Sequence, residues 1–335
     1  MNEPMDRFKT SVFEGSTAIT DFLDPGNHSP IPLVELPGEF NPLHAQGVRI
    51  FAKLMYLLPL LNIKSLPALN MLIEAKAAGK LKGVHTLIEN SSGNTAFSLA
   101  VLAPLFGVPR TVAILPWDIA PAKLEILRVS GVEPRLKRDD PAGPSGIAEA
   151  RAQGEQPGFF NAGQYSNDAN PAAYEKWVAP QIWNQTRGKI TVFAAGLGTT
   201  GTLVGAGRYF KRRTQNVSIV GGVCRPGEAV PGVRPLARLG EIEFDWRGVA
   251  DSIIEVGTVE SFRKSLQLCR AGIVAGPSSG FALVALQRFL EEKKKDSSLD
   301  RLRNADGEVM AVFICCDTPF PYLDKYSTHL DASDF

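Results

Sequence analysis

The sequence predicts an α/β protein of two lobes, each with a central, mostly parallel sheet flanked by helices. From about residue 48 onward, short β-branched or aromatic runs alternate with longer helical patterns, which is typical of parallel α/β sheets. A chain of 335 residues is also longer than one compact core usually accommodates. Because ligands of open α/β sheets bind at the carboxyl ends of strands, we expect a cleft between the lobes.

The expected strands are short and apolar, as buried parallel strands are. They are residues 48–56, 84–89, 111–115, 190–195, 217–223 and 309–315. The expected helices lie between them, at residues 67–80, 95–106, 121–130, 171–186, 202–213, 259–270 and 279–294. Gly107 and Gly131 follow two of these helices, where a left-handed cap is needed.

Two segments interrupt the alternation. Residues 141–158 are rich in proline and glycine, so we expect a surface connection there. Residues 225–246 form a second stretch without a regular pattern.

The charge and hydropathy patterns exclude several functions. Lysine plus arginine total 36 and aspartate plus glutamate total 35, for a formal charge of +1, so neither nucleic acid nor an anionic membrane is an expected partner. No apolar run reaches the roughly 18 residues that a membrane helix needs. The acidic residues among the first 28 argue against a transit peptide, and that segment has no apolar signal core.

The cysteines and histidines predict neither a disulfide framework nor a metal centre. The four cysteines include no CxxC pair, and scattered thiols in a long chain indicate a reducing, cytoplasmic compartment. The four histidines are isolated from one another, with no zinc-ligand spacing and no catalytic-triad pattern.

Three segments share one design, in which a strand ends, a loop of small polar residues follows and a helix begins. They are residues 89–95 (ENSSGNT), 196–202 (GLGTTGT) and 276–280 (GPSSG). Free backbone N–H groups and a partial positive charge at helix starts bind phosphates and carboxylates. Each segment taken alone is also explained by ordinary helix capping.

The middle segment matches GxGxxG, so a dinucleotide site is an alternative to a single phosphate. A dinucleotide fold places an acidic residue about 20 positions further on to hold the ribose. The next strand ends instead in Val223-Cys224-Arg225, which disfavours NAD but leaves NADP open. Repeated threonine and glycine at a helix start suit a phosphate monoester equally well.

Lys64 lies just before a helix start that Ser65 and Pro67 mark. The helix dipole favours anions at that end, so a lysine is poorly placed there electrostatically. It is either a solvated surface lysine or an amine that forms an imine with a carbonyl group.

Taken in order, these segments resemble the cysteine synthase and cystathionine β-synthase family, the fold type II pyridoxal-phosphate enzymes. Residues 59–64 are similar to part of the family's NPxxSxKDR segment, which carries its Schiff-base lysine. Residues 91–96 (SSGNTA) are similar to the family's TSGNTG loop, and residues 198–202 (GTTGT) to its phosphate loop GTGGT. Residues 164–165 with 170–171 are similar to the family's QY…NP stretch. Residues 276–280 are similar to its GxSSG, and residues 32–36 to its opening TPLVEL. The likeness runs from about residue 30 to 322.

The resemblance implies pyridoxal 5′-phosphate as the cofactor and a role for each matching residue. Lys64 would be the catalytic residue, which carries the cofactor and moves the α-proton. The other cofactor-binding residues would be Asn94 at the 3′-oxygen, Gly198, Thr199, Thr200, Gly201 and Thr202 at the phosphate, and Ser278 at the pyridine nitrogen. The substrate carboxylate would be bound by Ser91, Ser92, Thr95 and Gln164.

The implied reaction is a β-replacement through an α-aminoacrylate intermediate. An activated serine (O-acetylserine, O-phosphoserine or serine) loses its β-substituent, and a small nucleophile, sulfide in the commonest family members, adds in its place. The implied domains are residues 1–57 (an N-terminal extension and the first strands of the large domain), 58–160 (a smaller, mobile, substrate-side domain) and 161–335 (the large domain that binds the cofactor phosphate). The family is usually homodimeric, so we expect a homodimer.

The sequence departs from the family pattern mainly on the substrate side. Ser65-Leu66 replaces the Asp-Arg pair after the lysine, Ser91 replaces a threonine and Thr200 replaces a glycine. Residues 230–238 (VPGVRPLAR) replace the IxGxGAGxxP substrate segment. We therefore expect an unusual donor or nucleophile, with Arg234 or Arg238 binding an anionic substrate group; both arginines are otherwise solvated loop cations.

Three other functions remain open from the sequence. A serine/threonine dehydratase or cysteine desulfhydrase would use the same intermediate for elimination alone. A catalytically silent regulatory homologue would explain the missing Asp-Arg pair, but it has little reason to keep Lys64, Asn94 and Ser278 together. An NADP dehydrogenase depends on the GxGxxG match alone.

Overall fold

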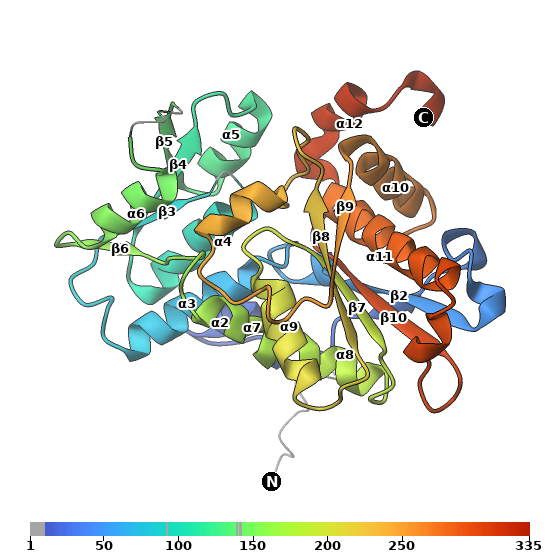
Figure 1. Cartoon of the computed structure of the whole chain (residues 1–335). Helices are drawn as coiled ribbons and strands as arrows, with labels where there is room; N and C mark the ends of the chain where they lie inside the picture. Colours follow the sequence, from blue (N-terminus) through green and yellow to red (C-terminus); the bar gives the residue numbers. More distant parts are fainter. Residues whose placement is uncertain (1–10, 92, 139, 141–142) are drawn as a thin grey trace, which may run out of the picture.

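A computed structural model describes residues 11–91, 93–138, 140 and 143–335. Figure 1 shows two lobes side by side, each with its own sheet. The larger sheet has six strands in the order β1-β2-β10-β7-β8-β9, and the smaller has four in the order β5-β4-β3-β6. This confirms the predicted α/β class with two mostly parallel sheets.

The larger sheet is parallel except at one edge, where β1 pairs antiparallel with β2. Its strands are β1 (Leu33–Glu35), β2 (Val48–Leu54), β7 (Val192–Gly196), β8 (Ser218–Cys224), β9 (Ser252–Val256) and β10 (Val309–Cys315). Every residue of β10 is buried, as its uninterrupted apolar run predicts. Helices α9 (Gly201–Lys211) and α11 (Pro277–Lys295) pack on this sheet.

The smaller sheet is parallel throughout. Its strands are β3 (Thr86–Asn90), β4 (Arg110–Pro116), β5 (Val132–Lys137) and β6 (Phe159–Asn161), and its helices are α4 (Asn94–Leu102), α5 (Pro121–Val129) and α6 (Gly146–Gly154). Strands β3 and β7 each lead into a loop and a helix start that contain predicted site residues, at 91–95 and 198–202.

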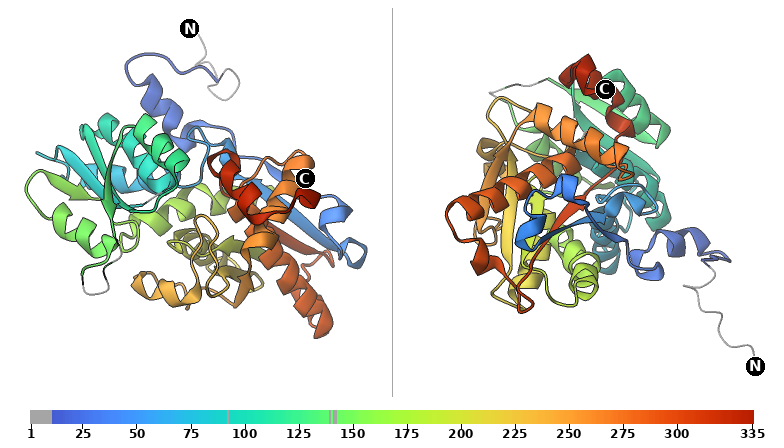
Figure 2. Two further views of the ribbon diagram at one scale, coloured as in Figure 1. Left: turned by 90° about the horizontal axis from the view of Figure 1, so that it is seen from above. Right: turned by 90° about the vertical axis from the view of Figure 1, so that its right-hand side faces the viewer.

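The other α-helices are α2 (Ala18–Leu23), α3 (Ser65–Ala77), α7 (Ala169–Trp177), α8 (Ala179–Gln185), α10 (Thr258–Arg270) and α12 (Leu323–His329). Figure 2 shows α2, in dark blue, projecting from the body in both views. No helix in the described part of the chain is long and apolar enough to cross a membrane.

Two predictions of local structure were wrong, and four strands were missed. The expected connection 141–158 contains α6, which Ser145 caps by accepting a hydrogen bond from the Ala148 amide at 3.2 Å; residues 141 and 142 lie outside the described part. The expected helix 171–186 is two helices, because Pro180 at the start of α8 has no amide N–H to continue α7. Strands β1, β5, β6 and β9 were not predicted.

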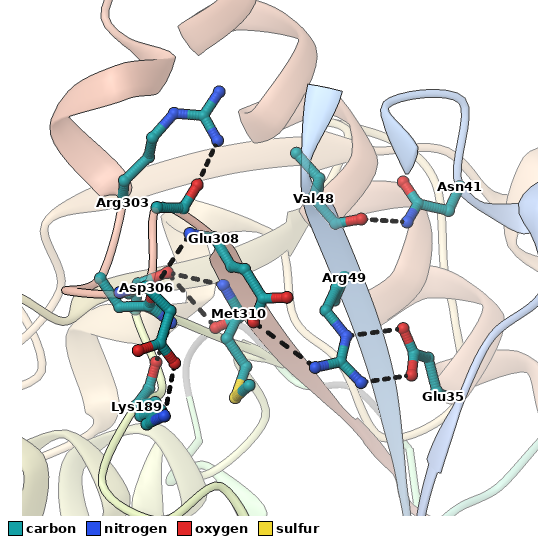
Figure 3. A network of polar contacts seen from close by, with 12 residues as sticks. Glu35, Asn41, Val48, Arg49, Lys189, Arg303, Asp306, Glu308 and Met310 are labelled. Carbon is teal, nitrogen blue, oxygen red and sulfur yellow. Dashed lines mark hydrogen bonds and ion pairs between the residues drawn. The ribbon is translucent and has the colours of Figure 1, made fainter. Parts of the chain in front are cut away.

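A polar network fixes the β1 edge of the larger sheet (Figure 3). The Arg49 guanidinium donates to both carboxylate oxygens of Glu35, at 2.9 and 2.7 Å, and lies 3.5 Å from the Glu308 carboxylate. The Asn41 amide donates to the Val48 carbonyl at 2.8 Å. Because the charged side chains are about one-third exposed, each pair contributes at most about 1 kcal/mol, and their main effect is to hold β1 in register.

Candidate active site

A cavity of about 240 Å³ lies at the carboxyl ends of β3, β7 and β10. Its walls come from the start of α3, the β3–α4 loop, the β7–α9 loop, the start of α11 and the residues after β10. Segments that are far apart in the sequence thus meet where a ligand of an α/β sheet is expected.

The structure brings most of the predicted site residues to this cavity. Those that line it are Lys64, Ser91, Asn94, Thr95, Gln164, Gly198, Thr199, Thr202, Arg234 and Ser278. Thr200 and Gly201 are buried in the same loop and are not among the lining residues. Ser92 lies outside the described residues. Arg238 does not line the cavity, because it lies exposed in the 3-10 turn Leu236–Glu241.

Lys64 is the residue that immediately precedes α3. The Ser65 hydroxyl donates to the Asn62 carbonyl at 2.8 Å, which closes the turn before the helix. The Ile63 amide donates to the Cys316 carbonyl at 2.8 Å, which attaches this turn to the end of β10. The side chain of Lys64 therefore projects into the cavity from a backbone held at two points.

The loop after β3 is held by side-chain hydrogen bonds to other segments. The Asn94 amide nitrogen donates to the Asp317 carboxylate at 2.6 Å. The Thr95 hydroxyl donates to the Gln164 side-chain oxygen at 2.8 Å, and the Gln164 amide nitrogen donates to the Asn90 carbonyl at 3.0 Å. Thr95 and Gln164 thus hold each other beside the free N–H groups at the start of α4.

Glu89 supports this loop from behind. It is buried, and it accepts hydrogen bonds from the backbone N–H groups of Asn90 and Gly163 at 3.0 Å and of Gln164 at 3.3 Å. Burial raises the pKa of Glu89 to about 7, and the N–H donors act in the opposite direction. Glu89 therefore attaches Gln164 to the end of β3.

The loop 198–202 is tightly packed before α9. A Cβ atom at Gly198 would lie 2.2 Å from the Gly232 carbonyl oxygen, and one at Gly201 would lie 2.2 Å from the Asn170 side-chain oxygen. Thr200 has a left-handed φ of +65°. The Asn170 amide nitrogen donates to the Thr199 hydroxyl at 3.1 Å, so this loop is positioned from two sides.

These residues fit a phosphate ester of pyridoxal. The N–H groups of the first turn of α9 have no partner within the helix, and Thr199 and Thr202 line the cavity beside them. Among the described residues, the Thr200 hydroxyl is buried without a hydrogen-bond partner. Lys64 supplies the amine that an imine needs.

The segment 230–234, which stands in place of the family's substrate segment, lies against this loop. The Arg234 amide donates to the Leu197 carbonyl at 2.8 Å, and the Cys224 amide donates to the Arg234 carbonyl at 3.1 Å. The Arg234 guanidinium lies 4.7 Å from the centre of the Tyr165 ring and 3.5 Å from the Glu241 carboxylate. Its side chain is 17% exposed, so little water screens its charge inside the cavity.

Lys123, Cys316, Asp317 and Tyr322 also line the cavity, and they belong to none of the motifs found in the sequence. The Asp317 carboxylate also accepts from the Tyr322 hydroxyl at 2.6 Å, and its burial raises its pKa. Burial raises the pKa of the Cys316 thiol to about 11 and lowers the pKa of Lys123. No local spacing signals these residues, because they come together only in the folded protein.

The cavity is cationic. Lys64, Lys123 and Arg234 line it, and Asp317 is the one carboxylate among its described lining residues. No group of His, Cys, Asp and Glu in the described part of the chain could hold a metal ion. An anionic ligand therefore suits the cavity.

Comparisons with known proteins agree with this site. The family model "Pyridoxal-phosphate dependent enzyme" matches residues 26–299. The chain is 33% identical to cysteine synthase B of Pseudomonas aeruginosa over 305 residues, which covers 90% of this chain and 94% of the relative. It is 30% identical to cysteine synthase B of Escherichia coli over 282 residues, which covers 83% of this chain and 87% of the relative.

Solved structures show the same fold. A cysteine synthase from Entamoeba histolytica superposes with a TM-score of 0.78 over 99% of this chain and 94% of that one, at 23% identity. An O-ureido-L-serine synthase superposes with a TM-score of 0.76 over 94% of this chain and 96% of that one, at 25% identity. The fold type II architecture and the cofactor pyridoxal 5′-phosphate, both expected from the sequence, are confirmed. The chain belongs to the family of pyridoxal-phosphate dependent enzymes.

Proposed function

We propose that the chain catalyses a β-replacement on an activated serine-type amino acid, namely O-acetylserine, O-phosphoserine or serine. The observation that carries this proposal is that Lys64 shares one cavity with Ser278, the loop at 198–202 and the loop at 91–95. The cysteine synthase relatives support the same reaction.

When bound, the cofactor supplies an electron sink for the electron pair released at the substrate Cα. Lys64 takes the α-proton and returns it to the same carbon at the end of the reaction. The β-substituent leaves with its bonding electron pair, and the lone pair of the nucleophile forms the new bond at Cβ. Electrons and protons therefore balance without an oxidant or a reductant.

The remaining residues position the reactants. Thr95, Gln164 and the N–H groups at the start of α4 would hold the substrate carboxylate. Asn94 would bind the 3′-oxygen of the cofactor, and Ser278 would place a neutral hydroxyl at the pyridine nitrogen. A neutral partner leaves that nitrogen unprotonated, which favours rapid loss of the β-substituent over longer-lived carbanion chemistry.

Arg234 would select among the donors. Its guanidinium lies in the cavity wall with one acidic partner, Glu241, at 3.5 Å. A planar fork of N–H donors suits a phosphate or a second carboxylate. This supports a donor with an anionic β-substituent, such as O-phosphoserine.

We also propose a homodimer in a reducing, cytoplasmic compartment. All four cysteines are free, which supports the reducing compartment. Sedimentation of the purified protein would measure the oligomeric state directly.

The direct test is to supply O-acetylserine, O-phosphoserine, serine and cysteine to the protein loaded with cofactor, with sulfide present, and to identify the products. We expect cysteine from at least one serine donor, and no product from a Lys64→Ala variant. Pyruvate as the main product despite added sulfide would assign β-elimination instead. No product from any donor would overturn both reactions.

A further inference from the structure

We propose that a second, apolar cavity beside the active site binds the apolar body of a thiol co-substrate larger than sulfide, with Lys123 pairing with its thiolate. This inference rests on the proposed function and names the class of nucleophile that the reaction uses.

The second cavity has a volume of about 270 Å³ and lies between α4, α5 and the segment that follows β10. Most of its wall is apolar, and six of its lining side chains are Leu60, Leu61, Phe97, Ile126, Leu127 and Phe320. Sulfide has no apolar body to fill such a space, whereas ligand pockets of this composition bind the apolar part of a small molecule.

The second cavity adjoins the active site. Five residues line both cavities: Gly93, Asn94, Lys123, Asp317 and Tyr322. A co-substrate in the second cavity therefore lies next to the loop that is expected to hold the amino-acid substrate. Two other surface cavities, beside residues 25–32 and beside residues 154–168, share no lining residue with the active site.

Lys123 is the cation at this junction. It lies in the first turn of α5, and its ammonium nitrogen is 3.8 Å from the position that a Cβ at Gly93 would occupy. Within the described part of the chain it forms neither a hydrogen bond nor a salt bridge. Burial lowers its pKa, whereas the nearby Asp317 carboxylate raises it. An anionic sulfur at the junction would give this ammonium group the direct hydrogen-bonded partner that it lacks among the described residues.

Exposed apolar side chains in the wall of the second cavity also indicate a ligand-binding site. Phe320 is 63% exposed, Leu61 is 58% exposed and Ile126 is 37% exposed, yet all three line the same cavity. Clustered exposed apolar side chains mark binding sites more often than scattered ones do. A phenyl or alkyl group in this cavity would cover all three.

Equilibrium binding to the cofactor-loaded protein tests the inference without turnover. Titration calorimetry compares two probes at a pH where the thiol of thiophenol is ionised. Thiophenolate then has an aromatic ring and an anionic sulfur, whereas phenol has the ring but no charge. We expect thiophenolate to bind about tenfold more tightly than phenol, and Lys123→Met to remove that advantage, because one charge-assisted contact is lost. Lys123→Met should leave the binding of phenol unchanged.

Phe320→Ala and Leu323→Ala form a matched pair for the ring. Both side chains are apolar and similarly exposed, at 63% and 59%, but only Phe320 is among the residues that line the cavity. We expect Phe320→Ala to weaken both probes by roughly threefold to tenfold because buried apolar area is lost, and Leu323→Ala to leave both unchanged.

The inference is overturned if thiophenolate does not bind, or if the two alanine variants have equal effects. If the probes do not bind and Phe320→Ala changes the oligomeric state in light scattering, the surface is instead a contact between subunits. If the probes fail to bind but cysteine still forms from sulfide, this inference fails and the proposed function stands. If no donor gives product although thiophenolate binds, the proposed function fails instead.

Discussion

The side-chain amide of Asn94 donates a 2.6 Å hydrogen bond to the buried carboxylate of Asp317. Asn94 begins α4 beside the smaller sheet, and Asp317 follows β10 of the larger sheet. One amide hydrogen of Asn94 is thus used by Asp317, and the other is available for the cofactor 3′-oxygen that we propose Asn94 binds. Asp317 therefore acts as a positioning residue for Asn94.

Replacing Asp317 should loosen this arrangement. We expect Asp317→Ala to weaken cofactor binding by about tenfold, because a charge-assisted hydrogen bond contributes roughly 1.5–3 kcal/mol, and to shift the visible absorbance of the bound cofactor. Tyr322→Phe removes the other side-chain donor to Asp317 and should have a much smaller effect. In an Asp317→Ala background, Asn94→Ala should cause little further loss; fully additive losses would show that the two residues act independently.

Thr200 has an unfavourable backbone conformation for a β-branched residue, with φ at +65°. A non-glycine residue in this region costs on the order of 1 kcal/mol or more. Thr200→Gly should therefore raise the free energy of unfolding of the cofactor-free protein by about 1 kcal/mol. The gain should shrink when cofactor is added. In the natural protein the Thr200 hydroxyl, which otherwise has no partner, would then bond to the phosphate, and the variant lacks this bond. Chemical denaturation with and without cofactor measures both values, and equal gains would show that the hydroxyl does not reach the phosphate.

The two arginines of the segment 230–238 should differ. Arg234 lines the cavity and Arg238 does not, so Arg234→Ala should raise the KM for an anionic donor by about tenfold or more, as expected for a lost charge-assisted contact. Arg238→Ala is the matched control and should leave KM unchanged. An unchanged KM in Arg234→Ala for every accepted donor would remove Arg234 from substrate recognition.

Lys53 should make stability depend on pH. Its ammonium group is buried and donates to the Ile31 carbonyl at 2.6 Å and to the side-chain oxygens of Gln181 and Gln185 at 2.8 Å. Burial lowers its pKa from 10.5 to about 7. Between these pH values the unfolded chain binds the proton more tightly than the folded protein, so the folded state gains stability as the pH rises from 7 toward 10.

Urea denaturation measures the free energy of unfolding of the natural protein and of Lys53→Met at neutral and at alkaline pH. The difference between the two proteins isolates the contribution of Lys53, because they share all other titrating groups. We expect the natural protein to gain about 1–3 kcal/mol relative to the variant as the pH rises. Identical pH dependence of the two proteins would show that Lys53 keeps an ordinary pKa in the folded state.

The parts of the fold that could be predicted were those encoded by uninterrupted local patterns. Strand β10 is a continuous apolar run and its predicted bounds match the structure. Strand β5 (VEPRLK) was missed because it contains charges and Pro134, which an edge strand tolerates. Helix α6 was missed because the prolines and glycines before it dominate the composition of residues 141–158.

In the candidate site, too, the sequence could identify residues that belong to local motifs but not those that only long-range contacts bring together. Lys64, Asn94 and Ser278 belong to short ordered motifs, so the sequence could identify them. Lys123 and Asp317 belong to no such motif, and only the approach of the two sheets brings them to the same cavity. Arg234 and Arg238 could not be distinguished in the sequence, because the turn that exposes Arg238 depends on packing beyond the segment itself.

The covalent bond at Lys64 is the central claim, and borohydride trapping tests it most directly. The protein loaded with pyridoxal phosphate is reduced, digested and mapped by mass spectrometry, with Lys64→Ala as the control. We predict one pyridoxyl adduct, on the peptide that contains Lys64, and none at that site in the variant. A protein that binds the cofactor but carries the adduct on another lysine, or carries none, would contradict the account.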